Sequence, residues 1–111
     1  MPINQDTSSN AAVCFNRGNA AFRSQQWAEA VIDFQGALLQ QPDLAPAALQ
    51  AARCLVKLGD FMTAREAFAK VLRLEPANYS AWLEAGHLCR QMGELQQASG
   101  AYQRAIDASP E

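Results

Sequence analysis

The chain has 111 residues, half of them hydrophobic, and a formal net charge of −2 at pH 7. This length and composition predict one folded domain rather than a disordered chain. No apolar run approaches the roughly 20 residues that span a bilayer. The opening segment MPINQDTSSN lacks the basic and apolar regions of a signal peptide, so we expect a cytoplasmic protein.

Metal and disulfide sites are not indicated by the cysteines, which are Cys14, Cys54 and Cys89. They form no Cys-x-x-Cys pair, and His87 is the sole histidine, so no zinc-like ligand set is present. We expect the three thiols to be small buried groups in a reducing compartment.

Six helices are predicted in chain order from apolar residues at helical spacing and from residues that start or stop helices. Residues 1–10 are polar and are predicted to be a flexible tail, with Asn10 as the first helix cap. The expected helices cover residues 11–24, 27–40, 45–58, 61–74, 79–92 and 95–108. Their short connections make neighbours antiparallel, and no strand pattern competes, so the predicted fold class is all-α.

A period of 34 residues divides the chain into three similar units, residues 11–44, 45–78 and 79–111. The same residue types recur at this spacing: Ala30, Phe34 and Pro42, then Ala64, Phe68 and Pro76, then Ala98, Tyr102 and Pro110. Gly18 and Gly86 are two periods apart, and Gly inside a helix costs about 1 kcal/mol against Ala. We therefore expect another helix to approach the backbone closely at both glycines.

The period resembles the tetratricopeptide repeat, whose signature is W-x2-L-G-x2-Y, then A-x3-F, an Ala and a Pro. The third unit matches best, with Trp82, Ala85-Gly86 and Cys89 in the slots of its first helix. The resemblance implies an α-solenoid, a right-handed superhelix of three antiparallel helix pairs whose first helices line a concave groove. Family members commonly end in a capping helix, and none follows here. We therefore expect Tyr102 and Ile106 to be exposed and available for self-association.

The first helices of the three units carry most of the positive charge. They hold five basic residues and a single acid, Glu84, whereas the rest of the chain holds four basic and ten acidic residues. Residues one period apart then form apolar and polar rows on one face of these helices. The candidate groove residues are Phe15, Asn19, Phe22, Arg23, Leu49, Arg53, Val56, Lys57, Leu83, His87, Arg90 and Gln91. We expect this groove to bind a peptide with acidic and apolar character, the alternative being ordinary solvated helix faces.

The leading functional interpretation is a non-catalytic scaffold or adaptor module. No phosphate-binding loop, nucleophile elbow or paired carboxylates are present, so we expect no enzymatic activity and no cofactor. We expect no nucleic-acid partner, because the positive face is small and has no ladder of stacking aromatic residues, and no membrane partner, because no apolar run is long enough. The resemblance leaves two alternatives open: a recruiting arm of a longer enzyme, such as a bacterial glycosyltransferase or sulfotransferase, and a secretion-type chaperone.

Some co-chaperones of this family clamp the C-terminal carboxylate of large heat-shock proteins with basic and amide side chains. The slots that the resemblance assigns to that clamp hold Phe15, Asn19, Gln50, Ser80 and Glu84 in this chain. Only Asn19 matches, and Glu84 would repel a carboxylate. We therefore expect no clamp of this kind.

Overall fold

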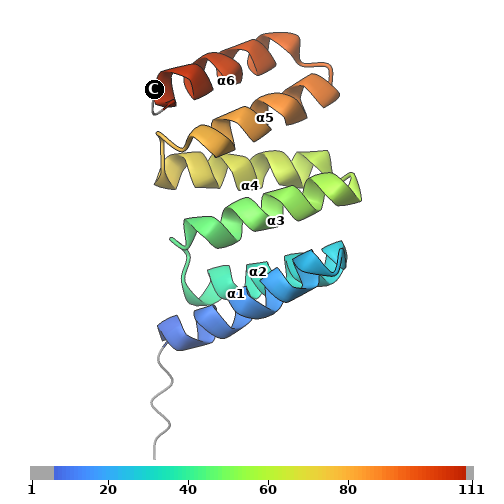
Figure 1. Cartoon of the computed structure of the whole chain (residues 1–111), viewed down its shortest axis with the longest axis vertical. Coiled ribbons are helices and arrows are strands. Elements are labelled where there is room, and N and C mark those ends of the chain that lie inside the picture. The colour runs from blue at the N-terminus through green and yellow to red at the C-terminus, as the bar shows by residue number, and fades with distance from the viewer. Residues whose placement is uncertain (1–6, 110–111) are drawn as a thin grey trace, which may run out of the picture.

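The protein is a stack of helices. The structure is a computed structural model that describes residues 7–109, with side chains from residue 10 onward. In this part of the chain the regular elements are α1 (Thr7–Arg23), α2 (Trp27–Gln40), α3 (Ala45–Leu58), α4 (Phe61–Leu74), α5 (Tyr79–Gln91) and α6 (Leu95–Ala108). Three antiparallel pairs follow one another along the long axis of a body of 56 × 27 × 21 Å (Figure 1). The predicted all-α solenoid is confirmed.

The first helix begins earlier than the sequence indicates. Helix α1 starts at Thr7, so Asn10 lies inside the helix and is not its cap. Ser and Asn have only moderate helix propensity, yet they extend a helix once its packed part has nucleated. The last four residues of the predicted tail therefore belong to α1, and residues 1–6 lie outside the described residues. The other five helices begin at the predicted residues.

The turns inside the helix pairs share one backbone conformation. Gly59 comes directly after α3, and Gly93 comes two residues after the end of α5. Their φ angles are 81° and 79°, in the left-handed region that glycine adopts without steric cost. Gln25 takes the equivalent position with φ of 60°. A side chain in that region costs roughly 1–2 kcal/mol, so the first turn is the strained one. Helix α3 ends at the predicted residue, and α1 and α5 each end one residue before the predicted one.

The core lies between the two helices of each pair and between successive pairs. Phe34 and Phe68 are buried there among alanine side chains. A Cβ atom placed on Gly18 would lie 2.7 Å from the Phe34 ring, and one on Gly86 would lie 2.7 Å from the Tyr102 ring. The expected close approach at both glycines is confirmed, because a helix neighbour's aromatic ring takes the space of the missing side chain.

The last helix pair and the cysteines differ in part from expectation. Ile106 is 65% exposed, but Tyr102 is half-buried against Gly86, so the expectation that both are exposed is wrong for Tyr102. Self-association through this helix stays a prediction. Cys54 is buried as expected, whereas Cys14 and Cys89 are only half-buried, and all three are free thiols. Within residues 7–109, no helix is long and apolar enough to cross a membrane.

Candidate peptide-binding groove

Hydrogen bonds connect the first helices of the three pairs, α1, α3 and α5. Gln50 Nε2 donates to Asn19 Oδ1 over 3.2 Å, and Arg53 Nη1 donates to Gln50 Oε1 over 2.9 Å. Arg53 then donates to the Glu84 carboxylate from Nε over 2.8 Å and from Nη2 over 2.5 Å. We call Asn19, Gln50, Arg53 and Glu84 the polar ladder. It places these faces of α1, α3 and α5 beside one another, as the 34-residue spacing predicts.

The ladder changes the role of Arg53. Sequence counting treated Arg53 as a base available to a ligand, but a two-point ion pair to Glu84 holds its guanidinium. The hydrogen bond to Glu84 raises the pKa of Arg53, while partial burial acts in the opposite direction. Bidentate pairs of this kind fix geometry as well as charge. Arg53 therefore braces α3 against α5, and it neutralises the one acid of the first helices.

A hollow of about 210 Å³ lies between α3 and α5, beside the polar ladder. Five of the candidate groove residues line it: Arg53, Val56, Lys57, His87 and Gln91. Its remaining lining residues are Glu84 and the apolar side chains of Phe68 and Leu88. Phe68 belongs to α4, the second helix of its pair, and is not among the candidate groove residues, so its contribution to this hollow could not be predicted from the positions of the first helices.

Phe22 near the end of α1 and Trp27 at the start of α2 form an aromatic pair beside Lys57 of α3. The Phe22 and Trp27 rings meet edge to face with centroids 5.2 Å apart, and Lys57 Nζ lies 5.8 Å from the Trp27 centroid. Trp27 is not among the candidate groove residues. Trp27 lies directly after the first turn and opposite the end of α3, and this position could have identified it as a candidate groove residue.

The other candidate residues divide into half-buried apolar groups and exposed polar ones. Phe15, Leu49 and Leu83 are half-buried, and the Phe15 ring packs on Phe34 at 5.8 Å between centroids. The exposed side chains are Arg23, Lys57, His87, Arg90 and Gln91. His87 is held in one orientation, because its Nδ1 lies 2.8 Å from the Tyr102 hydroxyl.

Among the described residues, no group of three or more His, Cys, Asp or Glu side chains could hold a metal ion. Arg17, a base of the first helices that is not a candidate groove residue, points toward α2. Its Nη1 lies 3.8 Å from Asp33 Oδ1. The groove face thus combines a braced polar ladder, an apolar hollow and exposed positive charge.

Comparison with known proteins identifies the repeat. The tetratricopeptide repeat family matches residues 11–44 and residues 49–111. Protein NPGR1 of Arabidopsis thaliana is 37% identical over 81 residues, which are 71% of this chain and 12% of that protein, so the chain spans a small part of its relative's length.

Solved structures of similar shape agree with the family match. The Arabidopsis OM64 TPR domain superposes with a TM-score of 0.90 at 22% identity, covering 95% of this chain and 87% of that one. The first TPR of Spaghetti (RPAP3), bound to the HSP90 peptide SRMEEVD, superposes with a TM-score of 0.89 at 21% identity, covering 99% and 86%. These likenesses show the fold, and together with the family match they lead to one conclusion. The chain belongs to the tetratricopeptide repeat family.

Proposed function

We propose that this chain is a protein-interaction module whose groove binds a peptide with acidic and apolar side chains. The twelve candidate residues of the sequence, with Trp27 and Phe68 added, form the proposed binding surface. Peptide-bound members of the family support the general role. The character of the peptide is inferred from the charges and the hollow described above.

The observation that carries the proposal is the charge left on the groove after internal pairing. Glu84 and Arg53 neutralise each other, and Arg17 is directed to Asp33. Arg23, Lys57 and Arg90 are exposed and take part in no ion pair among the described residues. The face therefore presents three positive charges and no unpaired acid, which favours an acidic partner and speeds its encounter.

The apolar part of the ligand is inferred from the hollow between α3 and α5. Val56, Phe68 and Leu88 line it, and its volume of about 210 Å³ suits one large apolar side chain. Lys57 lines the same hollow, so an acidic residue next to the apolar one would lie beside a positive charge. An apolar anchor flanked by an acid is thus the simplest ligand that uses both features.

A heat-shock C-terminal carboxylate does not fit the same positions. Asn19 Oδ1 already accepts a hydrogen bond from Gln50, and Glu84 already holds Arg53. A carboxylate placed there would have to displace Glu84 from its partner. We therefore propose that the ligand differs from the peptide bound by the Spaghetti (RPAP3) domain.

The test is a peptide array that contains pairs of matched sequences. Each pair places Leu, Phe or Met beside Asp or Glu in one peptide and beside Asn or Gln in the other. We expect the acidic member to bind more tightly and its binding to weaken as salt is raised. Replacing Lys57 and Arg23 together by Glu should weaken binding about tenfold, since exposed charge pairs contribute up to about 1 kcal/mol each.

The control variant reverses two bases on another face. Lys70 and Arg73 of α4 line a separate hollow beside Pro42 and Asp43. Replacing both by Glu changes the net charge by the same amount and should leave the affinity within about twofold. Equal loss in both double variants would show a net-charge effect and would overturn the proposal, as would equal binding of the acidic and neutral peptides.

A further inference from the structure

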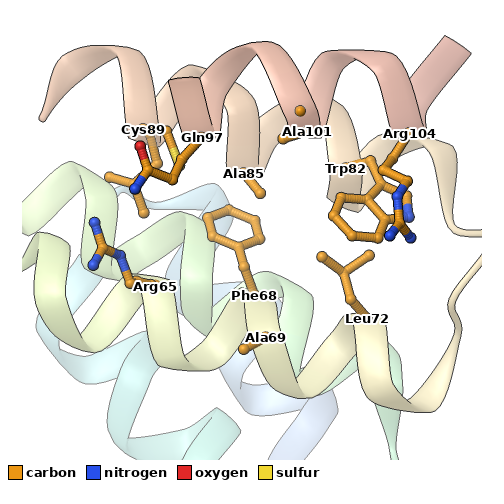
Figure 2. Close-up of a pocket in the computed structure, with 12 residues that line it drawn as sticks. Arg65, Phe68, Ala69, Leu72, Trp82, Ala85, Cys89, Gln97, Ala101 and Arg104 are labelled. Atoms are coloured by element: carbon orange, nitrogen blue, oxygen red, sulfur yellow. The ribbon is translucent and has the colours of Figure 1, made fainter. Parts of the chain in front are cut away.

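A second, larger hollow lies on the other side of the contact between α4 and α5. It measures about 380 Å³ and is formed by α4, α5 and α6 (Figure 2). Phe68 and Leu88 line both this hollow and the groove, so their side chains form the wall between the two. We call the larger hollow the outer recess.

The outer recess is elongated, with different side chains at its two ends. Figure 2 shows Trp82, Leu72 and Arg104 at one end, and Arg65, Cys89 and Gln97 at the other. Phe68 and Ala85 lie between them. Arg65 and Leu72 are seven residues apart on α4, so at 1.5 Å per residue the recess is roughly 10 Å long.

The repeat itself explains why this space is open. The family signature places Leu and Tyr in two slots of the first helix, and α5 has Ala85 and Cys89 there instead. Both residues line the recess. Figure 2 shows the bulky Trp82 side chain at one end of the recess, near Leu72 of α4 and Arg104 of α6. Both replacements remove side-chain volume from the lining of the recess.

The preceding repeat contains the matching control. One period earlier, a hollow of about 200 Å³ lies between α2, α3 and α4, and Leu55 takes the slot of Cys89 there. Glu66 lines that smaller hollow, and its counterpart in the outer recess is Gly100. The outer recess is thus larger than its counterpart, and it lacks the acid.

The charged groups at the recess differ in their availability. Arg65 is held by the Glu94 carboxylate and also contacts Met92 Sδ over 3.4 Å. Arg104 is exposed and lies over the Trp82 ring at 5.2 Å. No carboxylate of the described residues forms an ion pair with Arg104, although Asp107 shares a neighbouring hollow with it. An anionic group at this end would have a planar, two-point donor.

We propose that the outer recess binds a small amphipathic carboxylate, an unbranched aliphatic acid of about eight carbons whose length matches the recess. The aliphatic chain lies along Phe68 and Ala85, and the carboxylate lies at Arg104. The volume falls within the range of roughly 300–1,000 Å³ typical of small-molecule sites, and an apolar lining with one placed charge is their usual chemistry. The site is separated from the peptide groove by the wall that Phe68 and Leu88 form.

Octanoate is the probe, and Trp82 is the reporter. The sequence has two tryptophans, so Trp27→Phe leaves Trp82 as the only one, directly in the recess. Titrating octanoate should change Trp82 emission to saturation, and 1-octanol, which has the same chain without the charge, should bind about five- to tenfold more weakly.

Three further variants in the Trp27→Phe protein locate the site. Arg104→Gln should weaken octanoate about five- to tenfold and leave 1-octanol unchanged. Lys70→Gln, which removes the positive charge at the equivalent position one period earlier, should alter neither affinity. Cys89→Tyr restores the signature residue, fills the recess and should abolish binding of both probes.

Each outcome decides the proposal. Equal affinity for octanoate and 1-octanol, or equal effects of Arg104→Gln and Lys70→Gln, overturns the role of Arg104. Unchanged octanoate binding by Cys89→Tyr overturns the site itself. Circular dichroism and thermal melting report whether Cys89→Tyr folds, and Ala85→Leu, which also fills the recess, supplies the same test if it does not. The peptide test uses the protein that keeps Trp27 and reads out peptide affinity, so failure of octanoate binding in the Trp27→Phe protein leaves the peptide test unaffected.

Discussion

Replacing Gly18 by Ala tests the close helix contact on which the first repeat depends. The added Cβ would lie 2.7 Å from both Cδ1 and Cε1 of Phe34 and 3.0 Å from Cζ. Carbon atoms in favourable contact are about 3.5–4.0 Å apart, so the methyl group overlaps the ring by nearly 1 Å. Phe34 is fully buried and its ring also packs on Phe15, so it cannot move aside freely.

Two opposing terms determine the size of the effect. Ala is a better helix former than Gly by about 1 kcal/mol, which stabilises the variant. Overpacking a well-packed core costs about 1–3 kcal/mol, which destabilises it. We expect a net loss of about 1 kcal/mol in the free energy of unfolding, equivalent to a fall of about 4 °C in Tm for a domain of this size.

Gly100→Ala is the matched control. Gly100 lies inside α6, and a Cβ there meets no atom within 4 Å, so only the helix-propensity term acts. We expect a gain of about 1 kcal/mol, or a rise of about 4 °C in Tm. Urea unfolding and thermal melting followed by circular dichroism measure both variants. If Gly18→Ala raised stability as much as Gly100→Ala, the packing argument would be refuted.

Two other predictions concern a buried thiol and a helix cap. Burial raises the pKa of the Cys54 thiol from 9.0 to about 11, so the unfolded chain releases this proton first as pH rises. The free energy of unfolding should therefore fall by about 1.4 kcal/mol per pH unit between about pH 9 and pH 11. Urea titrations of Cys54→Ala should lack this pH-dependent fall. Equal pH slopes in the two proteins would contradict the prediction. Asn78 Oδ1 accepts the Ala81 N–H over 2.9 Å, so Asn78→Ala should lower stability by about 1 kcal/mol in urea unfolding. Asp60→Ala should cost less, because its bond to the Thr63 N–H is 3.4 Å long; a larger loss at Asp60 would show that bond length does not rank these caps.

Helix positions could be read from the sequence because they depend on nearby residues. Asn78 caps the start of α5, Gly59 caps the end of α3, and Pro76 stops α4 from continuing. Each of these residues lies within a few positions of the helix boundary that it sets. The prediction was wrong at α1, where no Gly or Pro marks the start and the polar residues after position 6 extend the helix. The 34-residue period then made the stacking of pairs predictable, because equivalent helices pack in equivalent ways.

By itself the sequence determined the all-α class, the three helix pairs, and the face on which the candidate groove residues gather. Only the tertiary structure decided what those residues do. Arg53 and Glu84 are 31 residues apart, and their pairing depends on how closely α3 approaches α5. The outer recess likewise depends on whether neighbouring helices close over Ala85 and Cys89. Residue types and spacing fix helices through local interactions, whereas ion pairing and unfilled volume depend on distances between helices that no local pattern encodes.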